Sequence, residues 1–444
     1  MHAFLLIALF VASYTLRWEY VKNTKIVGPV IKDAYYYTRI AHNLADNHVF
    51  SSAVDPKGRS THEARRPGYP YFLSSIVLFT DSFKSFYLTT LWLQSIIGAL
   101  TVLLSYALAR FLLPKPWALS VAFLTMVSPH MIAMNAFILS ECLFTFLIIL
   151  SLVFLVMGVK QEKTYGYMLS GITMGVAIFV RPVFELFPLL CCPIIYFSIR
   201  DKNRWTIFIV LSIFLFTSYS FQLSWSLWER IRLGQNPLMD DQLKTALIFG
   251  TYPDILYKDL PGMPDKEDPN FSALIKADYG TIIHYILNQF VQEPFRHITW
   301  WFIKKPVLFW SWKVFFGDGI NFYPVYYSWF DINPLMNFLR SFMLALHPFI
   351  VLLAGISVIF FKNLSWATKD INKKGESFCY AVCAVLIIHF TVMFMILAPF
   401  PRYALPMGPE LYLLGLFGLR KLWPQIRNGF YHGRINRDAI GIQT

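Results

Sequence analysis

Long apolar stretches alternate with shorter polar ones along almost the whole chain. A helix that spans a membrane needs about 20 mostly apolar residues, and several segments approach or exceed that length. The pattern therefore predicts about ten membrane spans. The first of them lacks the basic start and the small-residue cleavage site of a signal peptide, so we interpret it as an uncleaved span. The predicted spans cover residues 2–20, 86–112, 117–134, 138–159, 165–181, 183–199, 205–228, 335–361, 377–399 and 403–421.

One further apolar segment, residues 67–80, is only about 14 residues long and predicts a helix at the membrane interface rather than a span. When it is not counted as a span, the short connections rich in Lys and Arg fall on one side of the membrane, which marks that side as cytoplasmic. Both chain ends then lie inside, and two long polar segments face outside. The basic connections are residues 110–116, 160–164, 200–204 and 362–376, together with the tail after Arg420.

The same pattern divides the chain into three parts. Residues 1–228 form an N-terminal transmembrane module that includes the first outer loop, 21–85. Residues 229–334 form a second outer loop, whose clusters of Trp and Phe predict helices lying in the membrane interface, where Trp and Tyr anchor. Residues 335–444 hold the last spans and a basic cytoplasmic tail.

Composition supports a polytopic membrane protein of the all-α class. Hydrophobic residues make up 56% of the 444 residues and charged residues 15%, whereas a soluble protein carries about 25% charged residues. The net charge of +13 could indicate nucleic-acid binding. However, the Lys and Arg residues sit mostly in loops, and attraction to anionic lipid headgroups explains that distribution better. All five cysteines fall in apolar segments without a CxxC pattern, so they indicate neither zinc nor an outer-loop disulfide.

The first outer loop carries the candidate chemistry. Asp33 lies just after the first span, at the start of an amphipathic stretch, about 34–47, and Arg65 and Arg66 precede Pro67. A carboxylate at that point is either a helix N-cap or a general base that removes a proton from an acceptor at the membrane surface. The residues alone leave both interpretations open.

Two more arginines are expected at the same outer boundary, because Arg181 ends one predicted span and Arg402 begins another. An arginine there either snorkels to the interface or binds an anion, and a guanidinium binds phosphate oxygens in a bidentate way. Three separated arginine sites beside a carboxylate favour phosphate binding. Glu141, just inside the fourth span, is either a catalytic group or the buried partner of one of these arginines.

Other polar groups in the two outer loops are less informative. Lys304 and Lys305 lie between two aromatic clusters of the second loop, where an acceptor could meet the membrane surface. His42, His48, His62 and Glu63 have spacings that fit no zinc pattern. We therefore predict no metal ligand, and no cofactor is indicated.

Four short segments carry a family resemblance. They are Asp33–Tyr37 leading to Ile40–Ala41, Arg66–Leu73, Gly171–Pro182 and Arg402–Pro406, with Ser140–Glu141 as a weaker fifth. In their order and placement they resemble the GT-C glycosyltransferases, in particular the mannosyltransferase-like and aminoarabinose-transferase-like group that uses polyprenyl-phosphate sugars. The resemblance implies a GT-C-like fold and an inverting sugar transfer in which polyprenyl phosphate leaves.

The resemblance also implies that Asp33 occupies the position of the first-loop catalytic acid of that family. Ala34 follows, where many members have a second acidic residue, so the assignment of the base rests on Asp33 alone and a metal-dependent mechanism is not supported. Catalytic roles are expected for Asp33 and Glu141. Donor phosphate binding is expected for Arg65, Arg66, Tyr69, Arg181, Arg402 and Tyr403, and contact with the acceptor for Tyr36, Lys304 and Lys305.

The expected function is therefore an integral membrane glycosyltransferase, with its site on the outer face of a bacterial inner membrane. Its partners would be a polyprenyl-phosphate sugar, membrane lipids, and a lipid, glycan or protein acceptor, but no nucleic acid. Two alternatives remain. One is a ligase or polymerase of polyprenyl-linked glycans. The other is a transporter or flippase for a lipid-linked sugar, which would need charged residues near the mid-plane, whereas here the ionisable residues cluster at the outer boundary.

Overall fold

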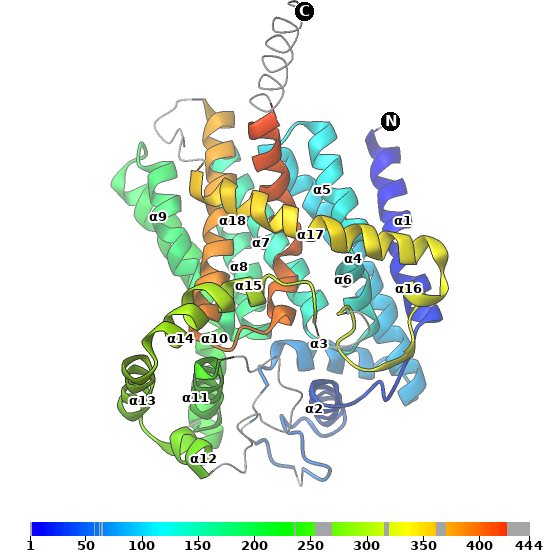
Figure 1. The fold of residues 1–444 in the computed structure, drawn as a ribbon, viewed down its shortest axis with the longest axis vertical. Coiled ribbons are helices and arrows are strands. Elements are labelled where there is room, and N and C mark those ends of the chain that lie inside the picture. The colour runs from blue at the N-terminus through cyan, green and yellow to red at the C-terminus, as the bar shows by residue number, and fades with distance from the viewer. Residues whose placement is uncertain are drawn as a thin grey trace, which may run out of the picture.

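The protein is a bundle of long helices with shorter helices gathered at one end (Figure 1). The computed structural model describes residues 2–56, 58–61, 63, 65–234, 237–253, 269–314, 319–360 and 370–423. Most of the basic loop predicted at 362–376, and the part of the basic tail beyond residue 423, lie outside the described residues.

Seven described helices are long and apolar enough to cross a membrane. An eighth span results if α5 (Lys115–Val127) and α6 (Pro129–Ala133) with the 3-10 turn η1 (Met134–Ala136) are taken together across a 55° bend. The all-α, multi-pass membrane architecture expected from the sequence is confirmed. The seven are α1 (His2–Asn23), α4 (Phe83–Leu112), α7 (Glu141–Gln161), η2 (Pro182–Phe184) with α9 (Phe187–Ile199), α10 (Arg204–Leu233), α17 (Pro334–Phe360) and α18 (Ile371–Ile396).

The remaining two of the ten predicted spans fall on shorter helices. α8 (Thr164–Val180) ends where Arg181 leads into Pro182, because a residue before proline disfavours the helical conformation. The last predicted span begins later than expected, since residues Pro401–Met407 form the 3-10 helix η4 and the regular helix starts at residue 408. α17 differs in direction from the other long helices. It runs across the bundle, whereas α7 and α18 run along it (Figure 1).

The short helix α8 is held by close packing of glycines. A side-chain carbon at Gly171 would lie 2.7 Å from the carbonyl oxygen of Phe214, and one at Gly175 would lie 2.9 Å from that of Thr217. Both carbonyls belong to α10. In a membrane, helices associate through such small residues, because lipid provides no hydrophobic force to drive them together. The end of α8, and with it Arg181, is therefore fixed against α10.

The first outer loop forms two helices at one end of the bundle, α2 (Asp33–Asn47) and α3 (Gly68–Val77), which pack against each other. A helix in residues 67–80 was predicted, and the structure has one of 10 residues there. Gly68 allows it to touch α8, since a side-chain carbon at Gly68 would lie 2.7 Å from the backbone of Phe179. The strands β1 (Lys25–Ile26) and β2 (Val325–Tyr327) pair antiparallel and join the first loop to the second.

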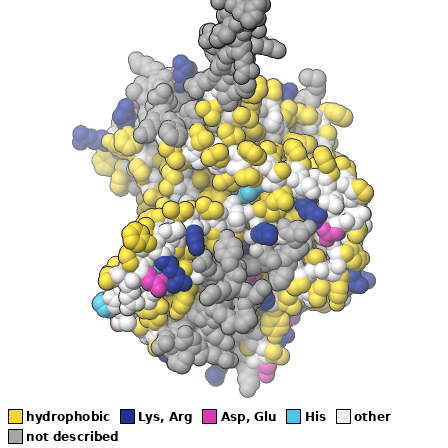
Figure 2. Space-filling model, in the orientation of Figure 1, with side chains coloured by type: hydrophobic (Ala, Val, Ile, Leu, Met, Phe, Trp, Pro, Cys, Tyr) yellow, Lys and Arg dark blue, Asp and Glu magenta, His cyan; other side chains and the backbone are white. Residues whose placement is uncertain are grey.

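The second outer loop is also largely helical where it is described, apart from β2 and the irregular segments beside it. Its first aromatic cluster falls on a π-helical turn, η3, and the second begins at the last residue of the helix that follows and continues beyond it. Figure 2 shows a broad hydrophobic area on the visible face of the molecule, to which the exposed phenylalanines of α17 belong. The helices of this loop are α11 (Pro237–Thr251), α12 (Pro269–Lys276), α13 (Tyr279–Gln292), α14 (Pro294–Thr299), η3 (Trp300–Lys304), α15 (Lys305–Phe309) and α16 (Trp329–Ile332).

Candidate active site

Four elements that are far apart in the sequence bring charged residues together at the loop end of the bundle. Asp33 is the first residue of α2 and Glu141 the first residue of α7. Arg181 follows the last residue of α8, and Arg402 lies in η4, just after α18. Consecutive spans run in opposite directions, so the end of one span and the start of the next reach the same side of the bundle.

Arg402 joins the two carboxylates. Its Nε donates a hydrogen bond to Oε1 of Glu141 at 2.5 Å, and its Nη2 donates to Oδ2 of Asp33 at 2.9 Å. The side chain of Arg402 is 12% exposed and that of Glu141 is fully buried, whereas that of Asp33 is 27% exposed. Asp33 is therefore the carboxylate that a ligand can reach, and Glu141 lies beneath it.

Two further arginines complete the cluster, which we define as Asp33, Arg65, Glu141, Arg181 and Arg402. Arg65 pairs with the second oxygen of Asp33. Arg181 places Nη2 2.7 Å from Oε1 of Glu141, and its Nε donates to Oγ of Ser140 at 2.9 Å. Three guanidinium groups thus face two carboxylates, which leaves one positive charge uncompensated within the cluster. A partly buried site with that balance attracts an anion.

The arginines set the protonation of Asp33. Burial alone would raise the pKa of its carboxyl, but the nearby charges of Arg402 and Arg65 outweigh that effect and hold the pKa below its ordinary value. Asp33 is therefore ionised at neutral pH in the ligand-free protein.

This shift predicts how stability depends on pH. Because the pKa of Asp33 is lower in the folded state, its contribution to stability is fully present above the pKa of the unfolded chain, about 3.9, and is lost as the pH falls through the folded value. The difference in melting temperature between wild type and Asp33→Asn should therefore stay constant from about pH 5 to pH 8 and shrink below about pH 4. Thermal unfolding in lipid nanodiscs across this range measures it. A difference that already shrinks between about pH 7 and pH 5 would contradict the pairing.

Aromatic rings surround the cluster. The guanidinium carbon of Arg65 lies 5.2 Å from the ring centre of Tyr36, and that of Arg181 lies 5.6 Å from the ring centre of Tyr403. Such contacts orient a guanidinium by cation–π attraction. Tyr69, expected at the donor phosphate, is fully buried, and its hydroxyl donates to Oε1 of Gln94 at 2.6 Å. Its ring packs against Tyr37 at a centre distance of 4.9 Å, so Tyr69 helps to hold α2, the helix that begins with Asp33.

Arg66 and Arg39 carry unused hydrogen-bond donors. Nη2 of Arg66 is 3.7 Å from Oε2 of Glu185, while its Nε and Nη1 are buried without a hydrogen-bond partner among the described residues. The same holds for Nε and Nη2 of Arg39 on α2. Buried donors without partners are rare in native proteins, and an absent ligand or ion is one explanation for them. Sequence reasoning missed Arg39, although its position on the same amphipathic helix as Asp33 was a usable signal.

The two lysines expected at the acceptor lie in different environments. Lys304 is exposed at the end of η3. Lys305 is fully buried, and its Nζ donates to the carbonyl oxygen of Met395 at 2.7 Å. Burial lowers the pKa of Lys305 to about 7. An acceptor has no access to this ammonium in the structure, which differs from the expectation for Lys305.

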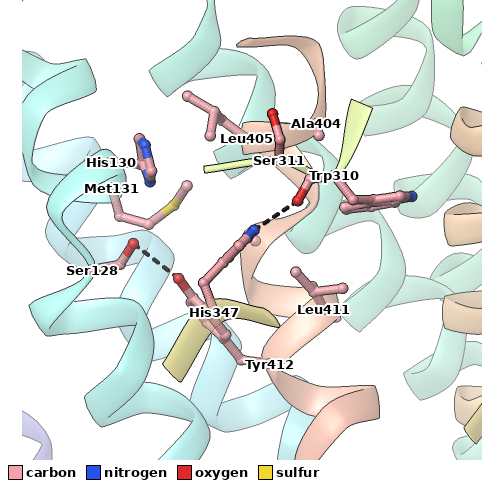
Figure 3. Close-up of a pocket in the computed structure, with 11 residues that line it drawn as sticks. Ser128, His130, Met131, Trp310, Ser311, His347, Ala404, Leu405, Leu411 and Tyr412 are labelled. Carbon is pink, nitrogen blue, oxygen red and sulfur yellow. Dashed lines mark hydrogen bonds between the residues drawn. The ribbon is translucent and has the colours of Figure 1, made fainter. Parts of the chain in front are cut away.

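A small cavity lies behind η4 and is shown in Figure 3. Its lining includes Ser128, His130, His347, Ala404 and Tyr412. His347 Nε2 donates to the carbonyl oxygen of Trp310 at 2.7 Å, and the Tyr412 hydroxyl donates to Ser128 Oγ at 2.9 Å. The cavity offers about 30 Å³, enough for one or two waters but not for a sugar.

Possible metal ligands do not gather in the described part of the chain. No group of three or more His, Cys, Asp or Glu residues there is arranged to hold a metal ion. Nδ1 of His42 lies 3.8 Å from Oδ2 of Asp46, and His62 falls outside the described residues.

Comparison with known families identifies one match. A sequence model of the family described as dolichyl-phosphate-mannose-protein mannosyltransferase matches residues 65–225. That region contains Arg65, Arg66, Glu141 and Arg181, while Asp33 and Arg402 lie outside it. No curated protein sequence matches the chain at a significant level.

Solved structures show a similar fold. The archaeal oligosaccharyltransferase AglB from Archaeoglobus fulgidus, in complex with an inhibitory peptide and a dolichol-phosphate, has a TM-score of 0.53 at 15% identity, covering 100% of this chain and 52% of AglB. Its apo form has a TM-score of 0.53 at 13% identity, covering 99% of this chain and 52% of AglB. ArnT from Cupriavidus metallidurans bound to undecaprenyl phosphate has a TM-score of 0.46 at 15% identity, covering 98% of this chain and 64% of ArnT.

This chain therefore spans about half the length of the AglB chain that it matches. The resemblance to GT-C glycosyltransferases is confirmed at the level of the fold.

Proposed function

We propose that this protein is an integral membrane glycosyltransferase that moves a sugar from a polyprenyl-phosphate donor to an acceptor. The observation that carries the proposal is the cluster in which Arg402 bridges Asp33 and Glu141 and one positive charge is left over. It combines a reachable carboxylate with an anion site at one end of an apolar bundle. The match to a family of dolichyl-phosphate-mannose enzymes, and the fold shared with AglB in complex with a dolichol-phosphate, support the class of donor.

The chemistry follows from what such a donor needs. Its sugar is already bonded to a phosphate that can leave, so no nucleotide is required at the site. An acceptor oxygen or nitrogen attacks the anomeric carbon from the side opposite the phosphate, and the bond between that carbon and the phosphate oxygen breaks. The electron pair leaves with the phosphate, the acceptor proton goes to Asp33, and the configuration at the anomeric carbon inverts. The arginines stabilise the charge that develops on the leaving phosphate.

Donor binding changes the partners of Asp33 in this scheme. Both of its oxygens accept hydrogen bonds from arginines in the structure. A phosphate that binds Arg65 and Arg402 competes with Asp33 for the same donors. As it takes them over, the carboxylate loses the charges that lower its pKa and becomes a stronger base. The unused donors of Arg66 offer a further contact for phosphate.

The other predicted residues take supporting roles in the proposal. Glu141 is fully buried, so it acts through Arg181 and Arg402, which it holds in place. Tyr36 and Tyr403 orient arginines by their ring faces, and Tyr69 helps to hold α2. We propose that the site lies on the outer face of the membrane, because the basic short loops lie at the opposite end of the chain's spans.

The direct test uses purified protein in lipid nanodiscs and a panel of radiolabelled polyprenyl-monophosphate sugars, offered with membrane extract as the source of acceptor. Release of polyprenyl phosphate and a labelled product are expected with at least one donor. The product should have the opposite anomeric configuration to the donor.

Two further arms separate the alternatives. Turnover of polyprenyl-diphosphate glycans, with no turnover of monophosphate sugars, would place the protein among ligases or polymerases. Movement of a labelled lipid across a proteoliposome bilayer, without any covalent product, would identify a transporter and overturn the proposal.

A further inference from the structure

Lys305 is a buried lysine that binds the end of a membrane helix. Its Nζ donates to the carbonyl oxygens of Met395 at 2.7 Å and Ile396 at 3.4 Å, and it lies 3.7 Å from the ring centre of Trp301. Met395 and Ile396 are the last residues of α18. The final carbonyls of a helix have no partner within the helix, and the negative end of the helix dipole attracts a cation. Lys305 thus supplies the cap that the sequence of α18 lacks.

Other residues of the second loop hold the same helix end. The indole Nε1 of Trp300 donates to the carbonyl oxygen of Gly250 at 2.9 Å. Gly250 in turn packs on α18, because a side-chain carbon there would lie 2.9 Å from the carbonyl oxygen of Ile396. Nε1 of Trp310 donates to Oγ1 of Thr391 at 3.0 Å. Contacts from α11, from α15 and from Trp310 just after α15 therefore hold the C-terminal part of α18.

The C-terminal end of α18 leads directly to the cluster. The chain passes from Ile396 through a short extended segment into η4, which contains Arg402. Phe394 of α18 stacks on Tyr403 with ring centres 5.0 Å apart, and Phe309 of α15 also stacks on Phe394 at 4.9 Å. The ring centre of Tyr403 lies 5.6 Å from the guanidinium carbon of Arg181 and 5.9 Å from that of Arg402. A shift of the α18 end would therefore move Arg402 relative to Asp33.

We infer that Lys305 is a positioning residue for the proposed transfer: by capping α18 it fixes Arg402 against Asp33 and Glu141, and it ties the second outer loop to the site. The catalytic role of Lys305 rests on the proposed function, whereas its role in fixing the position of Arg402 does not. The cluster tolerates little displacement, since a shift of about 1 Å in a positioned catalytic group can cost about 100-fold in rate.

The test compares Lys305→Met, which keeps length and apolar bulk, with Lys305→Arg, which keeps the charge. Lys276→Met serves as the matched control, because Lys276 is an exposed lysine of the same loop at the end of α12. The first readout is hydrogen exchange in nanodiscs, followed for a peptide that covers residues 395–403 and for one inside α7. The second readout is the steady-state kinetics of the donor identified for the wild type.

For Lys305→Met we expect faster exchange in residues 395–403 with no change inside α7. We also expect kcat to fall about 10- to 100-fold while KM for the donor changes less than about 3-fold. In Lys305→Arg, both the exchange rate of residues 395–403 and kcat should stay close to the wild-type values. Lys276→Met should match the wild type.

A second variant keeps the inference testable if Lys305→Met does not fold. Gly250→Ala pushes on Ile396 from the other side without touching Lys305, and it should raise exchange in residues 395–403 in the same way.

Unchanged exchange and unchanged kcat in Lys305→Met would overturn the inference. A lower yield of folded Lys305→Met with a normal kcat for the folded fraction would also overturn the inference, because Lys305 would then only stabilise the fold and would not position Arg402 for the reaction. If the wild type turns over no donor, the proposed function fails, and the exchange experiment still decides whether Lys305 fixes the Arg402 segment.

Discussion

Asp33→Asn is expected to abolish sugar transfer while the protein still binds its donor. The substitution keeps the size of the side chain and one oxygen for an arginine, but an amide cannot accept the acceptor's proton. Removing a positioned general base costs about 10²- to 10⁴-fold in rate. Donor affinity should stay the same or rise, because the phosphate no longer competes with a carboxylate for Arg65 and Arg402. Single-turnover transfer and equilibrium binding of the same radiolabelled donor measure both quantities.

Asp46→Asn is the matched control for this experiment. Asp46 belongs to the same helix as Asp33, its side chain is 63% exposed, and its nearest ionic partner is His42. Transfer should be unaffected in this variant. Retained transfer in Asp33→Asn would remove Asp33 from the reaction. Loss of donor binding together with transfer would show that the substitution disrupts the site rather than the proton transfer.

Arg402→Met is expected to destabilise the protein and to abolish transfer. Arg402 binds both carboxylates, and Glu141 is fully buried, so the substitution leaves a buried charge with one partner fewer. Removing one member of a buried ion pair costs about 3–5 kcal/mol. The leaving phosphate also loses a cation that offsets its developing charge, and this loss should lower the transfer rate by about 100-fold or more. Unfolding in nanodiscs and donor turnover measure the two effects.

A double variant separates the two effects of Arg402→Met. Adding Glu141→Gln removes the buried charge that Arg402 had compensated, so stability should recover in part, whereas transfer should stay lost. Arg296→Met is the control, since Arg296 is exposed and pairs with Glu293 within one helical turn. It should change stability by no more than about 0.5 kcal/mol. Equal destabilisation by Arg296→Met and Arg402→Met would show that the cluster has no special role in stability.

Local pattern was enough to predict the helices and the end of the bundle at which these charged residues meet. A run of apolar residues needs a helix in a membrane, because an apolar solvent offers no partner for unpaired backbone groups. The apolar segments therefore became helices close to their predicted bounds. Asp33, Arg181 and Arg402 were assigned to one side because each lies at the end of a span, and alternating span directions bring such ends together.

The same reasoning failed where a residue's environment depends on distant parts of the chain. The hydrophobic pattern placed Lys305 at an interface with Lys304, but contacts with the end of α18 bury it. It did not indicate the direction of α17, which is long and apolar enough for the predicted span but runs across the bundle (Figure 1). The sequence shows that Arg39 shares an amphipathic helix with Asp33, but only the packing of that helix buries two of its donors without partners among the described residues.

The amino-acid sequence was thus sufficient for the membrane class, for the helical segments and for the set of charged residues at their ends. Those features follow from the length of apolar runs and from the residues that border them, and both are local. Only the tertiary structure decided that Arg402 bridges Asp33 and Glu141, that Arg65 holds the second oxygen of Asp33, and that Lys305 caps α18. These pairings join residues from 32 to 369 positions apart, and the tilt and close packing of the helices determine which ends meet.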